Sequence, residues 1–236
     1  MSVLLSYSLS DFLLFSPRVY ERLFEVHNEA MWPAHCVAVL SGFAIISFVI
    51  RTRAWSGRVV YALLGVAWLV VAWAFFLRRY QTINWAAEYV APVIASEGVL
   101  LLVLAVLARP PEPTFRRTPA GVTAIAVLLV GLLGYPLIAP LSGRSWQSAE
   151  LFALTPDPTA VVTLAVVALS SGAARWMAIL IPTAWCIVTG LTLWALSWPD
   201  FFVAPLSAAL ALGAAVGNVP RHHSRDILRR IGKRGF

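Results

Sequence analysis

The sequence predicts an all-α polytopic membrane protein, with about seven transmembrane helices that follow an amphipathic interfacial helix. Three observations predict this class: 60% of the 236 residues are hydrophobic, only 12% are charged, and the apolar residues gather in long runs. A soluble domain carries about 25% charged residues. This chain has too little charge to cover a water-facing surface, so we expect lipid to face much of it.

Residues 1–32 form the first predicted region. Ser16 followed by Pro17 is typical of a helix start, because serine caps free amides and proline fits the first helical position. Beyond it, apolar residues recur with the helical period and charged residues take the opposite face. The apolar row comprises Val19, Leu23, Phe24 and Met31. We expect this row to bind another membrane protein subunit or a second copy of the chain.

A transmembrane bundle is predicted over residues 33–219. A helix needs about 20 apolar residues to cross the hydrocarbon core. Seven runs approach this length, at residues 33–50, 59–77, 86–108, 119–138, 158–174, 176–194 and 201–219. Only residues 170–175 separate the fifth run from the sixth, so six or seven spans, and a tight turn or a broken helix, are both open there.

The positive charges predict the orientation. If successive loops alternate between the two sides, the loops after spans one, three and five share one side with the tail, 220–236. This side holds thirteen of the 18 Lys and Arg residues. Cytoplasmic loops carry such an excess. The N-terminus is therefore expected outside and the basic tail inside the cell. The outer loops hold most carboxylates, including Glu150, Asp157 and Asp200, so we expect an acidic outer surface.

Glu97 is the first candidate site residue, because it lies about 16 Å along the third span, near the bilayer midplane. A charged carboxylate costs about 2.5–3.5 kcal/mol at that depth. It is expected either to bind an ion, a proton or a ligand, or to pack between helices as a neutral acid. Pro92 is expected to kink this span. Glu88 lies on the opposite face and is expected to pair with Arg78 or Arg79.

Asp157 and His35 are the other candidates for ion or ligand binding. Asp157 stands in TPDPT, residues 155–159, where it is expected either to cap the fifth span, with Pro158 first in the helix, or to meet a solute. His35 enters the first span beside Cys36. The interfacial position favours a hydrogen-bonded role for His35 over metal binding, and no metal ligands are predicted.

Several function classes lack their residues. No H-E-x-x-H, G-x-S-x-G or Walker A motif is present, so an enzyme is not expected. The only lysine is Lys233 in the tail, which excludes a retinal Schiff base within a span. His35 is the only histidine within a predicted span, which disfavours haem. The net charge of +7 lies in loops and tail and indicates topology, not nucleic-acid binding. No cofactor is identified.

Four stretches carry a resemblance to a known family. They are YSLSDFLLFSPRVY at 7–20, HNEAMWP at 27–33, TPDPT at 155–159 and Ile181 with Pro182. The chain resembles an uncharacterised family of bacterial multi-pass membrane proteins that is known only as a domain of unknown function. The resemblance implies a bacterial inner-membrane setting and no activity.

Two functions remain open from the sequence. The first is transport or permeation of a small solute or ion, with Glu97 as the midplane carboxylate and the acidic outer surface gathering cations. The second is a non-catalytic accessory or structural subunit of a larger membrane complex, respiratory or photosynthetic for example, with apolar helices packed on its partners.

Overall fold

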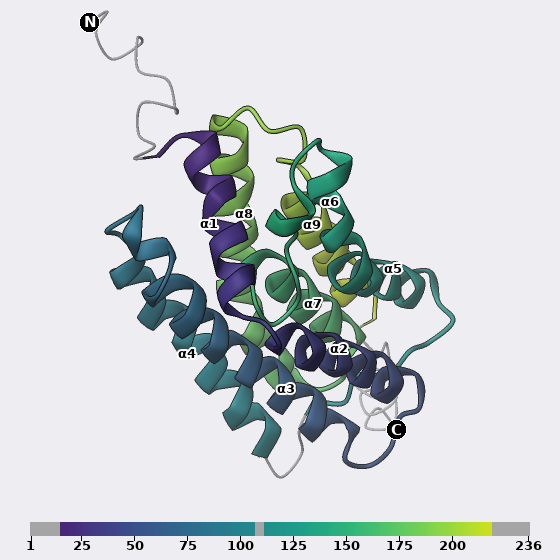
Figure 1. Ribbon diagram of the computed structural model, residues 1–236. Coiled ribbons are helices and arrows are strands. Elements are labelled where there is room, and N and C mark those ends of the chain that lie inside the picture. Colours follow the sequence, from purple (N-terminus) through teal and green to yellow (C-terminus); the bar gives the residue numbers. More distant parts are fainter. Residues whose placement is uncertain (1–14, 107–110, 219–236) are drawn as a thin grey trace, which may run out of the picture.

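The computed structural model describes residues 15–106 and 111–218, and these residues fold into helices joined by short loops (Figure 1). The predicted tail lies outside this part. The α-helices are α1 (Pro17–Ala30), α2 (Ala34–Ile50), α3 (Ser56–Val70), α4 (Ala87–Val106), α5 (Pro119–Leu129), α6 (Tyr135–Leu141), α7 (Pro156–Leu169), α8 (Leu180–Ala195) and α9 (Val203–Gly217). Two π-helical segments, η3 (Val71–Leu77) and η5 (Val130–Gly134), continue α3 and α5. Three 3₁₀ segments, η4 (Tyr80–Thr82), η6 (Trp146–Ser148) and η7 (Ala173–Ile179), complete the order.

Four helical segments are long and apolar enough to cross a membrane. They are Ser56–Thr82, Ala87–Val106, Pro119–Leu141 and Ala173–Ala195. The pair α1 and α2, bent by 92°, makes a fifth if it counts as one span, whereas α7 and α9 are shorter apolar helices. The helical membrane class is thus supported by four to five candidate spans, fewer than the seven that the apolar runs predict.

Helix α7 forms the centre of the bundle, among α3, α5, α8 and α9 (Figure 1). All of its 14 residues are buried. It begins at Pro156, two residues before the expected Pro158, and ends at Leu169, where Ser170 is extended and Gly172 has a φ of 90°. The chain between the fifth and sixth apolar runs is therefore broken, because an extended residue and a left-handed glycine end the helix before η7.

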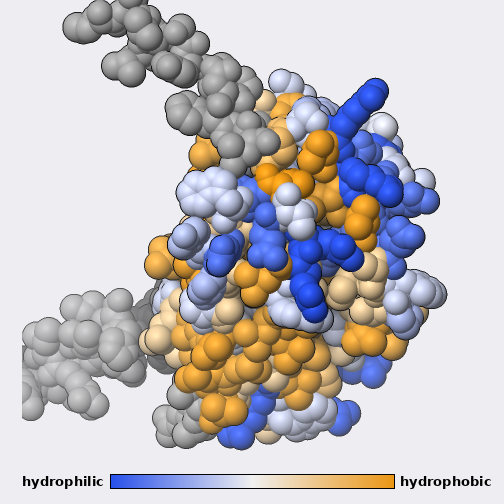
Figure 2. Space-filling view, turned by 60° about the vertical axis from the view of Figure 1, so that its left-hand side comes forward, coloured by the Kyte–Doolittle hydropathy of each residue, from blue (hydrophilic) through white to orange (hydrophobic). Residues whose placement is uncertain are grey.

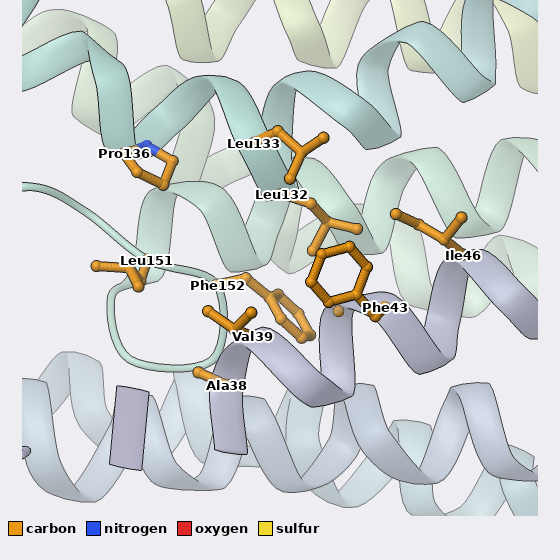
Figure 3. Close-up of a pocket in the computed structure, with 10 residues that line it drawn as sticks. Ala38, Val39, Phe43, Ile46, Leu132, Leu133, Pro136, Leu151 and Phe152 are labelled. Carbon is orange, nitrogen blue, oxygen red and sulfur yellow. The ribbon is translucent and has the colours of Figure 1, made fainter. Parts of the chain in front are cut away.

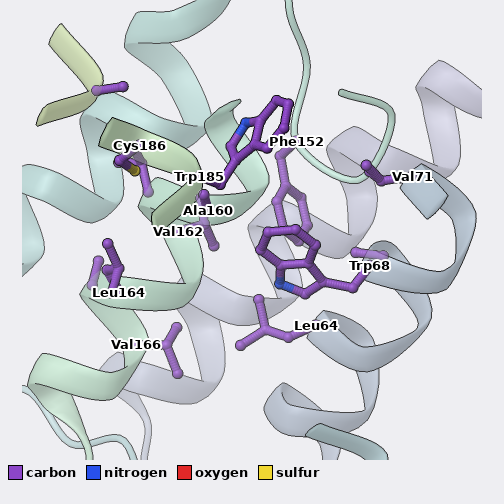
Figure 4. Close-up of a cluster of buried hydrophobic side chains, with 14 of the residues drawn as sticks. Leu64, Trp68, Val71, Phe152, Ala160, Val162, Leu164, Val166, Trp185 and Cys186 are labelled. Carbon is purple, nitrogen blue, oxygen red and sulfur yellow. The ribbon is translucent and has the colours of Figure 1, made fainter. Parts of the chain in front are cut away.

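Large apolar side chains from three helices fill the core (Figure 4). Leu64 and Trp68 of α3 face α7, while Trp185 of α8 comes from the other side (Figure 4). Phe152, in the loop before α7, lies between these two indole rings and is 4% exposed (Figure 4). This packing fixes α7 against both neighbours.

Helices α3 and α4 pack closely along their length, and two glycines allow the contact. A Cβ atom on Gly65 would lie 2.8 Å from the Gly98 carbonyl oxygen, and one on Gly98 would lie 2.9 Å from the Gly65 oxygen. Small residues are the usual means of such an approach between membrane helices. Helix α4 continues through Pro92, from Ala87 to Val106.

Helix α1 starts as predicted, with the Ser16 hydroxyl accepting from the Val19 amide and Pro17 first in the helix. Its apolar row, however, lies mostly inside the protein. Leu23 and Phe24 are 6% and 1% exposed, and Phe24 packs on Phe75 of η3. These two side chains are therefore not free for a partner, and that expectation is wrong for them; Val19 remains exposed and Met31 half-buried.

The surface carries extensive apolar area. Figure 2 shows one face on which hydrophobic side chains form a continuous lower region while hydrophilic side chains gather above. Exposed side chains on α4 include Val93, Val99 and Val103, each about half accessible. A soluble monomer rarely exposes such patches, and lipid is the solvent that suits them.

Candidate functional site: a buried acidic cluster beside the central helix

Three carboxylic side chains from separate segments meet at the start of α7. Glu150 comes from the loop after η6, Asp157 from the first turn of α7, and Asp200 from the loop before α9. Their exposures are 7%, 3% and 8%. Each lies close enough to the others for their charges to interact. We call Glu150, Asp157 and Asp200 the acidic cluster.

Asp157 is held by helix α8. Its Oδ1 accepts from Trp185 Nε1 at 2.7 Å and from Thr189 Oγ1 at 2.8 Å. Its position in the first turn of α7 also faces the positive end of the helix dipole. The sequence expectation that Asp157 caps the helix is wrong, because the cap position belongs to Thr155 and the Asp157 carboxylate joins two helices.

Arg144 supplies the positive charge beside the cluster. Its Nη2 donates to Asp200 Oδ2 at 2.5 Å, and both side chains are 8% exposed. The guanidinium also lies over the Trp198 ring, 4.0 Å from the centroid. A salt bridge with this little exposure is protected from screening, so it fixes the loop after α6 to the loop before α9.

Glu150 has no such partner. Its Oε2 is buried without a hydrogen bond within the described part of the chain. Burial, reinforced by the Asp157 carboxyl, raises the pKa of Glu150 well above its ordinary value, and Arg144 offsets only part of this. The cluster thus places three acids beside one arginine, an arrangement in which at least one carboxyl favours its neutral form.

A seam of polar contacts between α3 and α7 leads away from the cluster. Trp68 Nε1 donates to Thr163 Oγ1 at 2.9 Å, and Tyr61 Oη lies 3.1 Å from Ser170 Oγ. Thr163 and Ser170 are seven residues apart, which is about two helical turns on one face of α7. All four side chains are buried. We call these two contacts the α3–α7 seam.

Glu97 lies on α4, which packs along α3. It is 0% exposed, and neither carboxyl oxygen has a hydrogen-bond partner among the described residues. Its helix packs along α3, which carries Tyr61 of the seam. A buried polar group without a partner is uncommon in proteins and calls for an explanation. The structure therefore places the predicted carboxyl inside the bundle, on the helix that packs along α3.

The remaining predicted site residues lie elsewhere. Glu88 is exposed near the start of α4 and makes no ion pair with Arg78 or Arg79, and Arg78 lies instead over the Trp73 ring. That pairing is not formed. His35 is half-buried on α2 and lines a surface pocket. Neither residue joins the acidic cluster.

Sequence reasoning located part of this site and missed the rest. Glu150 and Asp200 were expected on an acidic outer surface, yet both are buried. Arg144 carries no sequence signal beyond a positive charge in a predicted outer loop. The available signal was the set of three acids and one arginine in consecutive outer loops, but loop sequence does not show which side chains the fold turns inward. Within the described residues no group of three histidine, cysteine or acidic side chains has the arrangement of a metal site.

Comparison with known proteins gives a family and no activity. No curated protein and no solved structure matches the chain. A family model described as "Family of unknown function (DUF6064)" matches residues 18–223, a range that contains the acidic cluster, the seam and Glu97. The chain therefore belongs to this family of unknown function, DUF6064.

Proposed function

We propose that this protein moves a small cation, in the simplest case the proton, across a bacterial inner membrane by way of the acidic cluster and Glu97. The observation that carries the proposal is the burial of three carboxyl groups with a single arginine. If all three ionised, two negative charges would stay uncompensated in a site shielded from water. Such charges cost several kcal/mol each, so the cluster favours uptake of protons or another small cation.

Glu97 supports the proposal as a second loading site. It stands eleven residues into the 20-residue helix α4, so it lies about midway along a candidate span. The α3–α7 seam places buried hydroxyl and indole groups along α7 and α3, and α3 packs along α4, which carries Glu97. Intramembrane acids that face a bundle interior are the usual elements of proton relays. Two buried titratable sites, with buried polar side chains on the helices between them, support the proposal.

Reconstitution in liposomes tests this function. Proton entry would be followed with an enclosed pH dye while a potassium diffusion potential drives it. Glu97→Gln and Asp157→Asn keep shape and remove the titratable charge, so flux should fall at least about tenfold in each. Glu88→Gln, at an exposed carboxyl of the same helix, is the matched control and should conduct as the parent does.

Two outcomes would reject the proposal. The first is a parent protein that carries no proton, sodium or potassium current in sealed liposomes. The second is unchanged flux in both variants, with size-exclusion profiles and helical circular dichroism equal to those of the parent. Equal folding in all variants is required, because Asp157 also joins α7 to α8.

The proposed topology has seven spans, with the N-terminus outside and the C-terminus inside. The seven apolar runs and the distribution of Lys and Arg support it. Gln147 and Thr52 are exposed in loops assigned to opposite sides. In a variant without the native cysteines, Gln147→Cys should react with an impermeant thiol reagent in intact spheroplasts, and Thr52→Cys only after lysis. Reversed labelling would overturn the orientation.

An accessory subunit of a larger membrane complex is the second candidate. The observation that favours it is a hollow of about 480 Å³ on the outside of α8 and α9, bordered by the large apolar side chains of Trp194 and Phe202. Such a surface suits a transmembrane helix of a neighbouring subunit. Extraction in mild detergent separates the candidates: stoichiometric co-purification of larger membrane proteins supports the subunit, and a protein that runs alone or as a homo-oligomer supports the transporter.

A further inference from the structure

Two hollows of different chemistry meet beside the bend between α1 and α2. The first, of about 660 Å³, has polar and aromatic walls, and the second, of about 300 Å³, has apolar walls. Leu151, in the loop before α7, lines both. We call the first the head pocket and the second the tail groove. The two hollows are therefore neighbours on either side of Leu151, one with a polar and one with an apolar lining.

One face of α2 runs from the head pocket into the tail groove. His35 lines the pocket, and Val39, Phe43 and Ile46 follow it along the groove. These residues recur every three or four positions, which is the spacing of a single helical face. Figure 3 shows Val39, Phe43 and Ile46 on α2, opposite Leu132 and Leu133 of η5, with Leu151 near one end.

The head pocket is lined by charges of both signs and by two indole rings. Arg22, Glu25 and Glu29 line it from α1, together with Trp32 and Trp146, whose side chains are 70% and 64% exposed. Arg22 Nη1 donates a hydrogen bond to Glu25 Oε2 at 2.7 Å. A guanidinium has five N–H donors, so further donors remain for an anion. Glu29 lies two helical turns after Arg22 on α1. Its carboxylate and the faces of the two indole rings are groups that bind a cation.

We propose that this site binds a zwitterionic phospholipid of the surrounding bilayer. Its phosphate would meet Arg22, its ammonium would meet Glu29 and the indole rings, and one acyl chain would lie in the tail groove. The two carboxylates against one arginine leave the pocket with a formal charge of −1, which disfavours a lipid with a net negative head. The apolar groove disfavours a free solute of the same head chemistry, because such a solute leaves those walls unoccupied.

Lipid binding to the full-length protein tests the site. After delipidation in detergent, the affinity for phosphatidylethanolamine, phosphatidylcholine and phosphatidylglycerol with identical acyl chains would be measured by native mass spectrometry and by the lipid-induced rise in thermal midpoint. Both zwitterionic lipids should bind the parent several-fold more tightly than phosphatidylglycerol. Glycerophosphoethanolamine, which has the head without chains, should not compete at equal concentration.

Matched variants separate the contribution of the head pocket to lipid binding from that of the tail groove. Val39→Trp fills the groove and should abolish specific lipid retention, whereas Val188→Trp, at a similarly exposed valine on α8, should retain the lipid as the parent does. Glu29→Gln should reduce the preference for zwitterionic heads several-fold, and the exposed control Glu88→Gln should not.

Three results would contradict lipid binding at this site. Phosphatidylglycerol binding as tightly as phosphatidylethanolamine, or equal lipid retention in Val39→Trp and Val188→Trp, would overturn it. Competition by the chain-free head would also overturn it, because the head alone would then account for binding. Proton flux plays no part in these measurements, so the result is independent of the transport function.

Discussion

Trp185 on α8 donates its indole N–H to the Asp157 carboxylate in the first turn of α7, with 2.7 Å between Nε1 and Oδ1. This bond is buried, and it joins the central helix to a candidate span. Hydrogen bonds to charged groups contribute about 1.5–3 kcal/mol, and a buried acceptor that loses its donor pays a desolvation cost. The position of the acidic cluster thus depends on α8.

Trp185→Phe should therefore destabilise the protein by about 1–3 kcal/mol, because the Asp157 carboxylate keeps its burial and loses one donor. Thermal unfolding in detergent measures the change. The control is Trp194→Phe on the same helix, where the ring is 55% exposed and no bond to the cluster exists within the described residues. Equal midpoints for the two variants would contradict the structural role of the bond.

Arg144→Gln should cost about 3–5 kcal/mol, because breaking a buried ion pair leaves the Asp200 carboxylate without its countercharge. The same substitution also removes the contact with the Trp198 ring. Adding Asp200→Asn should recover a large part of the loss, since no unpaired charge then stays buried at that position. A double variant as unstable as Arg144→Gln alone would assign the loss to packing.

Stability should depend on pH through Glu150, which lies in a loop outside the candidate spans. Since the pKa of Glu150 is raised in the folded protein, the folded state holds more protons than the unfolded chain above the ordinary value of 4.5. The stabilisation is fully present below that value and is lost as pH rises toward the folded pKa.

Glu150→Gln removes this titration and should flatten the decline. The thermal midpoint, measured from pH 4 to pH 8, should match the parent near pH 4 and exceed it at pH 8. Glu88→Gln, at an exposed carboxyl, should follow the parent across the range. A parent and a Glu150→Gln variant with parallel curves would show that Glu150 ionises as freely in the folded protein as in the unfolded chain.

Gly98→Ala should separate α3 from α4, because the new methyl group would lie 2.9 Å from the Gly65 carbonyl oxygen. Overpacking of this kind costs about 1–3 kcal/mol. Gly213→Ala on α9 is the matched control, since a Cβ there meets nothing within 4 Å and alanine favours a helix. The expected result is a lower thermal midpoint for the first variant and an unchanged or higher one for the second.

The sequence by itself determined the all-helical class, with several helices apolar enough to span a membrane, and several local features. Low charge and long apolar runs predict helices that face lipid, and the described parts of all seven runs are mostly helical. Ser16 and Pro17 specify the start of α1, because a cap depends only on residues next to it. Glu97 was also found from sequence, since a carboxyl in the middle of an apolar run is conspicuous wherever that run packs.

Only the tertiary structure decided which apolar and charged side chains are inside. In a membrane protein, residues that face lipid and residues that face the core are both apolar, so helical periodicity does not separate the wholly buried α7 from helices with exposed faces. The sequence likewise predicts a partner-binding surface in the apolar row of α1. In the structure, Leu23 and Phe24 of that row are buried in the chain's own core. Glu150 and Asp200 lie 50 residues apart in the sequence, and only the packing of their loops around α7 places both in one buried cluster. Burial and charge pairing depend on contacts between distant segments, and no local pattern of residues encodes them.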